Sequence, residues 1–134
     1  MTKVIVAEDY DSMREMWGIF LTRRGIEVTL CENGEQVLEE IAKNSHYDGL
    51  ITDDRMGPGI TGSDLTRILR QKLGDKFPIC LVSGTLSDKE AKEAGATYYF
   101  RKPVMMEQID EIANYLKPSH EDGKSDSEQQ YSGD

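Results

Sequence analysis

Residues 4–9 read Val4-Ile5-Val6-Ala7-Glu8-Asp9, and this stretch decides the fold class. Four consecutive apolar residues are far too few to cross a bilayer, and they are typical of a short strand that is buried on both faces of a parallel sheet. The apolar run ends at two carboxylates. Because open α/β sheets bind ligands just beyond the carboxyl ends of their strands, residues 8 and 9 are the first candidates for a functional site.

Four more short apolar runs follow, and helical patterns separate them. The runs cover residues 28–31, 50–52, 79–82 and 98–100. Apolar residues three and four positions apart mark four helices, in Met13, Met16, Trp17, Phe20 and Leu21, in Val37, Leu38, Ile41 and Ala42, in Leu65, Ile68, Leu69 and Leu73, and in Ile109, Ile112, Ala113 and Leu116. A fifth helix, of barely two turns, is expected between the capping-box residue Ser87 and Gly95. Strict alternation predicts an α/β fold, with a five-stranded parallel sheet and helices on both faces.

The composition excludes several classes of function. The chain has 134 residues, with 16 Lys and Arg against 25 Asp and Glu, so its formal charge is −9. Without a basic surplus, direct binding to nucleic acid or to an anionic membrane is not expected. The N-terminus lacks the pattern of a secretory signal, and two cysteines, Cys31 and Cys80, are too few for a disulfide framework. We therefore expect a cytoplasmic protein with two buried thiols.

The charge also divides the chain. Residues 118–134 contain five acidic residues, one lysine, a single aromatic residue and no aliphatic residue. Such a segment cannot bury enough apolar surface to offset the entropy lost on ordering. We expect one folded domain over residues 1–117 and an acidic disordered tail over residues 118–134.

Reactive side chains stand at the predicted carboxyl ends of four strands. They are Glu8 and Asp9, Asp53 and Asp54, Ser83, and Lys102. Carboxylates brought together repel one another, which raises their pKa values or requires a cation, and Mg²⁺ is a natural partner because it prefers oxygen ligands. Each acidic residue alone could equally be a helix N-cap. The complete set, in this order on one edge of a sheet, favours a functional site.

Four motifs resemble those of one known family, the receiver domains of two-component response regulators, and of the stand-alone chemotaxis regulators in particular. The motifs are Val4-Ile5-Val6-Ala7-Glu8-Asp9 with Ser12-Met13-Arg14, Tyr47-Asp48-Gly49-Leu50-Ile51-Thr52-Asp53, Ile79-Cys80-Leu81-Val82-Ser83-Gly84, and Tyr99-Phe100-Arg101-Lys102-Pro103. Each motif is weak alone, but four in order make a specific match. The resemblance implies a flavodoxin-like doubly wound (βα)5 fold.

The resemblance also implies a set of roles. A phospho-acceptor aspartate would end the third strand and take a phosphoryl group from a histidine kinase or a phosphotransfer protein. Glu8 and Asp9 would hold Mg²⁺ together with the acceptor, Ser83 would bond a phosphoryl oxygen, and Lys102 would pair with the phosphate. The resemblance further implies that the Lys102–Pro103 peptide bond is cis, as it looks to be across the family.

Two adjacent aspartates compete for the role of acceptor. On a strand Asp53 and Asp54 point to opposite sides, so only one can face the metal. The family usually has Met three residues and Pro four residues after the acceptor, but here Met56 favours Asp53 whereas Pro58 favours Asp54. The resemblance also implies an Asp five residues before the acceptor, and Asp48, which stands five residues before Asp53, therefore favours Asp53.

This register has consequences for the loop that follows. Asp54 is then expected to be a solvated loop carboxylate, and Arg55 would offer the metal only its backbone carbonyl. Gly57 reads as an inserted residue, so the loop is expected to be longer and looser than usual.

The resemblance further implies a switch and an output surface. Tyr99 matches an aromatic residue that turns inward when the Ser83 hydroxyl moves to the phosphoryl group. Purely structural roles stay open for both residues, since Ser83 could cap a turn and Tyr99 could be an ordinary strand residue. In the family the fourth helix, fifth strand and fifth helix commonly carry the output contact, so a short fourth helix would affect partner choice or the formation of a homodimer.

We therefore expect a single-domain response regulator that is phosphorylated on Asp53 with Mg²⁺ and signals to an unidentified downstream protein. The receiver uses all 117 folded residues, so the chain would either act through that contact or be a receiver excised from a larger protein. It would not be an enzyme, although it would assist its own phosphorylation and dephosphorylation. The first alternative is a pseudo-receiver, which binds partners without being phosphorylated. A second is an aspartyl-phosphate phosphatase, but that class looks like it needs its nucleophile and acid as Asp-x-Asp after the first strand, whereas this chain has Glu8-Asp9-Tyr10-Asp11.

Overall fold

A computed structural model describes residues 1–44 and 46–118. The strands are β1 (Lys3–Ala7), β2 (Glu27–Cys31), β3 (Gly49–Asp53), β4 (Ile79–Ser83) and β5 (Tyr98–Arg101). The helices are α1 (Asp11–Arg23), α2 (Gly34–Lys43), α3 (Gly62–Leu73), α4 (Asp88–Ala94) and α5 (Met106–Leu116). The predicted alternation of strands and helices is confirmed. Of the expected tail, residues 119–134 lie outside the described residues.

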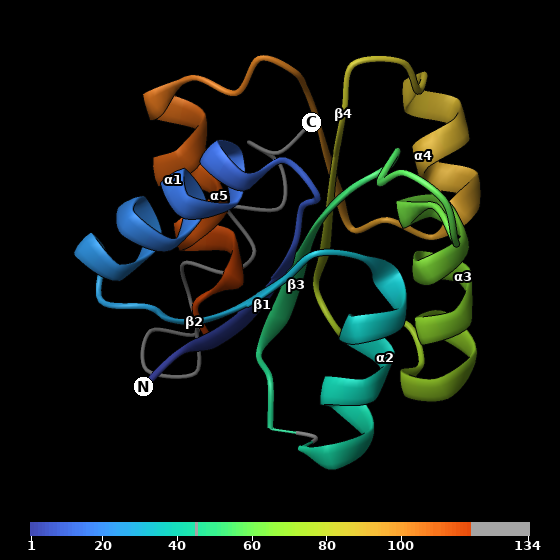
Figure 1. The fold of residues 1–134 in the computed structure, drawn as a ribbon, viewed down its shortest axis with the longest axis horizontal. Coiled ribbons are helices and arrows are strands. Elements are labelled where there is room, and N and C mark those ends of the chain that lie inside the picture. The colour runs from blue at the N-terminus through green and yellow to red at the C-terminus, as the bar shows by residue number, and fades with distance from the viewer. Residues whose placement is uncertain (45, 119–134) are drawn as a thin grey trace.

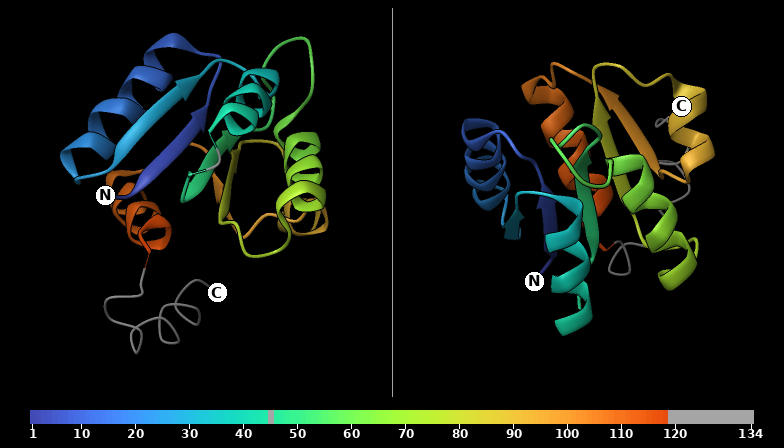
Figure 2. Two further views of the ribbon diagram at one scale, coloured as in Figure 1. Left: turned by 90° about the horizontal axis from the view of Figure 1, so that it is seen from below. Right: turned by 45° about the vertical axis from the view of Figure 1, so that its right-hand side comes forward.

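The strands form one parallel sheet in the order β2-β1-β3-β4-β5, and the helices cover both faces (Figure 1). Figure 2 shows α1 and α5 on one side of the sheet and α2 and α3 on the other. This is the doubly wound fold that the sequence predicts. The order places β1, β3, β4 and β5 next to one another, so their carboxyl ends meet at one edge.

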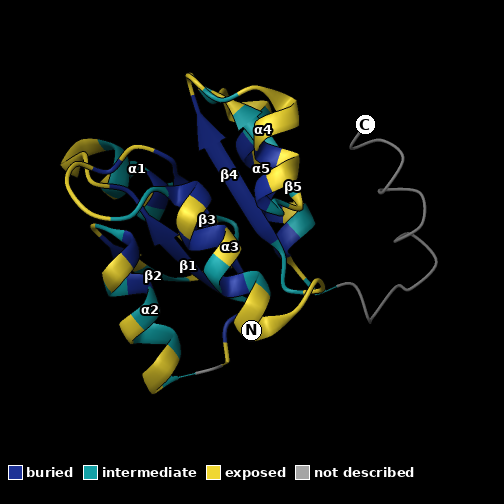
Figure 3. Ribbon diagram, turned by 90° about the vertical axis from the view of Figure 1, so that its right-hand side faces the viewer, coloured by how far each residue is buried: buried dark blue, intermediate teal, exposed yellow. Residues whose placement is uncertain are grey.

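Alternate residues of the strands supply two apolar cores. Val4 and Val6 of β1 face α1 and α5, where Trp17 of α1 lies in the same core. Ile5 of β1 faces α2 and α3 and packs in a second core with Leu65. Figure 3 shows the resulting burial, with dark strands inside and exposed residues on the outer sides of the helices. Both cysteines are buried free thiols, as expected.

The helix ends follow the local sequence. The side chain of Asn33 caps α2, and Ser87 and Glu90 form the predicted capping box of α4. Gly95 then ends α4 in the left-handed conformation with φ of 104°, so the predicted short helix is confirmed. No helix in the described part of the chain is long and apolar enough to span a membrane.

One arginine joins the ends of several elements on the edge opposite the carboxyl ends. Arg70 of α3 donates through Nε to the carbonyl of Gly95 at 2.7 Å and through Nη1 to the carbonyl of Phe77 at 2.7 Å. Its Nη2 donates to the hydroxyl of Thr97 at 2.8 Å. These bonds connect the end of α3 with the end of α4 and with the chain entering β4 and β5.

Candidate functional site

Three acidic side chains meet at the carboxyl edge of the sheet. Glu8 and Asp9 follow β1, and Asp53 is the last residue of the neighbouring strand β3. One carboxylate oxygen from each lies within 4.8 Å of the others. Glu8 and Asp53 are buried, whereas Asp9 is exposed. The structure therefore brings together the three carboxylates that the sequence singled out.

Lys102 reaches this acidic cluster from the end of β5. Its Nζ lies 3.1 Å from Asp53 Oδ1 and 3.7 Å from Glu8 Oε1. The Lys102–Pro103 bond is cis, as the resemblance implied. Burial by itself would lower the pKa of Lys102, but the hydrogen bond to Asp53 and the attraction of both carboxylates raise it. The ammonium group is therefore positively charged at neutral pH.

One lysine does not balance the negative charge. Burial, followed by the charge of Asp53, raises the pKa of Glu8 to about 7. Burial also raises the pKa of Asp53, although its hydrogen bond with Lys102 opposes that effect. A cluster of oxygen donors in which the carboxylates resist ionisation fits a divalent cation, which would relieve the repulsion.

Backbone contacts fix the position of Glu8. Its Oε2 accepts a hydrogen bond from the backbone N–H of Tyr10 at 3.2 Å. Arg14 of α1 donates to the carbonyl of Glu8 at 2.9 Å and also bonds Asp11 at 2.6 Å. Sequence reasoning gave Arg14 no role beyond its place in a motif. Its position six residues after Glu8, on the first turns of a helix that starts at the site, was the available signal.

The two adjacent aspartates have separate surroundings. Asp53 Oδ1 accepts a hydrogen bond from the backbone N–H of Asp54 at 2.9 Å and faces Lys102. The side chain of Asp54 is buried, with 6% of its surface exposed. Its Oδ1 accepts from the backbone N–H of Ser63 at 2.9 Å and from the Ser63 hydroxyl at 2.8 Å. The expectation of a solvated carboxylate at Asp54 is wrong, because this side chain caps the free N–H groups at the start of α3.

The loop between β3 and α3 forms hydrogen bonds at its ends and with a neighbouring helix. Its ends meet where the N–H of Gly62 donates to the carbonyl of Asp54 at 2.8 Å. Farther along, the N–H of Ile60 donates to Glu35 of α2 at 3.1 Å, and Met56 is buried. These contacts hold the loop at its ends and against α2. That the loop is longer and looser than is usual in the family stays a prediction.

Glycine is required where this loop closes on the site. A Cβ atom at Gly62 would lie 2.1 Å from the carbonyl oxygen of Asp53, far inside van der Waals contact. Gly57 has a φ of 72° and lies beside Asp9, whose carboxylate would be 3.9 Å from an added Cβ atom. The inserted glycine therefore runs alongside the acidic cluster. The Arg55 side chain is exposed, and the role of its backbone carbonyl stays a prediction.

Ser83 and Tyr99 are joined through the loop that follows β4. The buried Ser83 Oγ accepts hydrogen bonds from the backbone N–H groups of Thr85 at 3.0 Å and Leu86 at 3.2 Å. The turn-capping alternative thus describes what its hydroxyl does here. The Tyr99 hydroxyl bonds the carbonyl of Leu86 and lies 3.2 Å from the carbonyl of Ser83. Tyr99 is therefore more than an ordinary strand residue, because it contacts the same loop as Ser83.

Comparisons with known proteins agree with this geometry. The chain is 34% identical over 110 residues to the sensory/regulatory protein RpfC of Xanthomonas campestris, a match covering 77% of this chain and 15% of RpfC. The chain thus spans a small part of that relative. The fold superposes on the chemotaxis protein CheY4 of Vibrio cholerae with a TM-score of 0.78 and 28% identity, covering 87% of this chain and 99% of the other.

A second solved structure is similar to the same extent. It is the response regulator TrrA of Thermotoga maritima in complex with Mg(2+)-BeF, with a TM-score of 0.76 and 28% identity, covering 87% of this chain and all of the other. The model of the response regulator receiver domain matches residues 4–114. With the doubly wound fold and the acidic cluster at its carboxyl edge, this match shows that the chain belongs to the response regulator receiver domain family.

Proposed function

We propose that this receiver domain accepts a phosphoryl group on Asp53 from a histidine kinase or a phosphotransfer protein. The observation that carries the proposal is that Asp53 lies 3.1 Å from Lys102 and has a carboxylate oxygen within 4.8 Å of one each from Glu8 and Asp9. A nucleophilic carboxylate beside a fixed cation and a set of metal ligands is sufficient for phosphoryl transfer, which depends mainly on positioning and charge neutralisation.

The proposed transfer forms one bond and breaks one bond. A carboxylate oxygen of Asp53 bonds to phosphorus while the bond from phosphorus to the donor's imidazole nitrogen breaks, and that nitrogen keeps the electron pair. Lys102 neutralises charge on the phosphoryl oxygens, and the N–H of Asp54 keeps the acceptor carboxylate oriented.

Glu8, Asp9 and Asp53, with the Arg55 backbone carbonyl, would hold Mg²⁺. The ion supplies further charge neutralisation for the transferring group. Support comes from the donor set itself and from the complex of the similar protein TrrA with Mg(2+)-BeF.

Signalling would start at Ser83. When its hydroxyl bonds a phosphoryl oxygen, the present hydrogen bonds from the N–H groups of Thr85 and Leu86 to Ser83 Oγ must break. The loop would then shift, and Tyr99 would follow because its hydroxyl is bonded to the Leu86 carbonyl. This is a population shift between two conformations, biased by a local bond.

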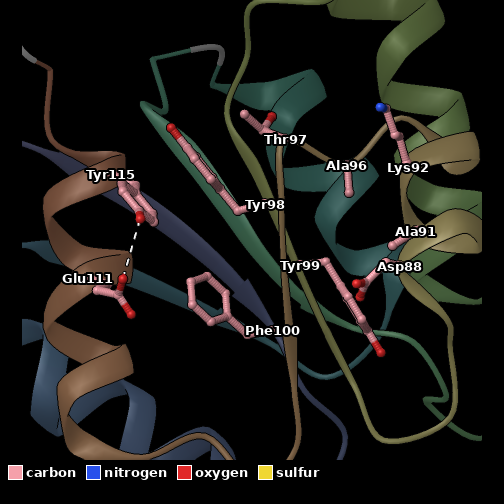
Figure 4. A pocket seen from close by; sticks show the side chains of 10 residues that line it. All are labelled: Asp88, Ala91, Lys92, Ala96, Thr97, Tyr98, Tyr99, Phe100, Glu111 and Tyr115. Carbon is pink, nitrogen blue, oxygen red and sulfur yellow. Dashed lines mark hydrogen bonds between the residues drawn. The ribbon is translucent and has the colours of Figure 1, made fainter. Parts of the chain in front are cut away.

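The output contact is proposed for the face formed by α4, β5 and α5. A cavity of about 550 Å³ lies there (Figure 4). Tyr98 stacks on Tyr115 of α5, with ring centroids 4.3 Å apart, while Tyr99 lies on the other side of β5, near Asp88 and Ala91. Movement of Tyr99 would therefore change the α4 side of this cavity, where a protein partner could sense it.

Modification by a small phosphodonor tests the proposal. Incubation with acetyl phosphate and Mg²⁺ should add one hydroxylamine-labile phosphoryl group, detected by intact mass spectrometry. Asp53→Asn should abolish the adduct, and Asp54→Asn, which keeps an acceptor oxygen for Ser63, is the matched control that should retain it. An unmodified wild type would instead support the pseudo-receiver, and an adduct on Asp54 would overturn the register.

We also propose that residues 1–117 are the receiver, that the acidic segment 118–134 lies outside it, and that the protein is cytoplasmic. The family match over residues 4–114 supports the domain boundary. Limited proteolysis followed by mass spectrometry tests it, since cleavage should be confined to the segment after residue 117.

A further inference from the structure

An apolar stripe lies on the outer edge of the molecule, where α1 packs beside the edge strand β2. Ile19 of α1 is 47% exposed and Leu30 of β2 is 43% exposed, although both are large aliphatic residues. In Figure 1 α1 and β2 lie on the left with α5 close to α1, and α3 and α4 lie on the right. The hollow on this stripe shares no lining residue with the cavity on the α4–β5–α5 face.

A glycine shapes this stripe. A Cβ atom at Gly18 would lie 3.2 Å from Leu30 Cδ1, so the absence of a side chain lets Leu30 rest against the helix. A shallow hollow of about 490 Å³ results, lined by Gly18, Ile19, Leu30 and neighbouring residues. An apolar side chain from a partner could enter this hollow.

Two unpaired charges lie symmetrically around Ile19. Glu15 and Arg23 stand four residues before and after it, on the same side of α1, and both line the hollow. Neither forms an ion pair with any side chain in residues 1–44 and 46–118. By contrast, the neighbouring Arg14 and Arg24 are paired at 2.6 Å, with Asp11 and Asp110 respectively.

We propose that this face binds a second copy of the chain, with the two α1 helices antiparallel and Ile19 near a two-fold axis. The arrangement brings Glu15 of each copy opposite Arg23 of the other and places each Ile19 against the hollow beside Gly18 and Leu30. A two-fold interface requires a surface that complements itself, and the order of negative, apolar and positive residues along α1 meets that requirement.

The face is small for a protein–protein contact. One face of a helix of 13 residues and part of a strand bury less than the roughly 800 Å² per partner of a stable complex. Contacts of this size are usually weak and transient, so we expect a dissociation constant on the order of 100 μM. Asp11 lies eight residues, or about 12 Å, from the axis, so the two acidic clusters stay at opposite ends of the contact.

Charge reversal provides the sharpest test, without phosphodonor or Mg²⁺, so that it is independent of the proposed phosphorylation. Sedimentation velocity of the wild type from about 10 μM to about 1 mM should show a concentration-dependent dimer. Glu15→Arg and Arg23→Glu should each weaken it by roughly tenfold or more, because each places like charges together twice. Lys72→Glu is the matched control, because it makes the same charge reversal as Arg23→Glu in the last turn of a different helix, α3. This variant should leave the dimer unchanged.

The mixture of the two variants decides the geometry. An equimolar mixture of Glu15→Arg and Arg23→Glu should restore a heterodimer, because both contacts then join opposite charges. A wild type that stays monomeric over the whole range would overturn the proposal, as expected if the face served a different protein. A dimer that neither substitution weakens, or a mixture of the two variants that stays monomeric, would also overturn the proposal.

Discussion

The Asp54 carboxylate lies 2.9 Å from the backbone nitrogen of Ser63, so the residue after the acidic cluster holds the start of α3. The last residue of β3 and the first residue of the following loop thus have different contacts. Asp53 faces the cluster and Lys102, while Asp54 closes the loop that borders it.

Removal of the Asp54 carboxylate should destabilise the fold. Asp54→Ala leaves the Ser63 N–H and hydroxyl buried without a partner, at a cost of about 1–3 kcal/mol in the free energy of unfolding. Urea denaturation measures the change. Glu39→Ala, at an exposed position of α2, should have little effect, and equal stability of the two variants would show that the cap contributes nothing.

A side chain at Gly62 should lower the free energy of unfolding more than a side chain at Gly25, which has a positive φ but open space around it. Gly62→Ala must displace the backbone of Asp53, at about 3 kcal/mol or more. Gly25→Ala meets nothing within 4 Å and suffers only its positive φ, at about 1 kcal/mol. The midpoints of urea unfolding compare the two, and a smaller loss at Gly62 would contradict the close approach.

Without metal, the stability should fall as the pH rises toward neutrality. Glu8 has a pKa of about 7 in the folded protein against 4.5 as its ordinary value, so between these values the folded state binds more protons than the unfolded one. The loss across that window is about 3 kcal/mol. Unfolding in EDTA at several pH values measures it. Glu8→Gln should flatten the dependence, and an unchanged slope in that variant would assign the effect to other groups.

Mg²⁺ should reverse this loss. At neutral pH the ion should raise the melting temperature, by an amount equivalent to about 1.4 kcal/mol at tenfold excess over its dissociation constant. Asp9→Asn removes an exposed member of the cluster and should weaken the effect. Asp88→Asn, at the start of α4 and outside the cluster, serves as the control. A melt that Mg²⁺ leaves unchanged would refute the metal site.

The fold was predictable because its signals are local. Runs such as Val4 to Ala7 are apolar on both faces, and capping residues such as Asn33 and Ser87 stand beside the helices that they start. The candidate site was predictable for the same reason, since parallel strands carry their terminal residues to one edge.

The surroundings of the site were less predictable, since they depend on the path of a loop. The hydrogen bonds from Ser63 to Asp54, nine residues earlier, and from Ile60 to Glu35 of α2 form only when the loop takes this path. The path depends in turn on Gly62 approaching the backbone of Asp53, a contact that no periodic pattern announces.

Different residues hold the two ends of α4. The guanidinium of Arg70 holds the carbonyl of Gly95 at the C-terminal end, whereas the N-terminal end adjoins the loop that Ser83 and Tyr99 contact. We therefore expect α4 to move as a short lever pivoting about Gly95, with the largest displacement near Ser87. Hydrogen exchange should then change around Leu86 on phosphorylation and stay constant at Ala96 and Thr97, and a uniform change along α4 would show that the pivot does not hold.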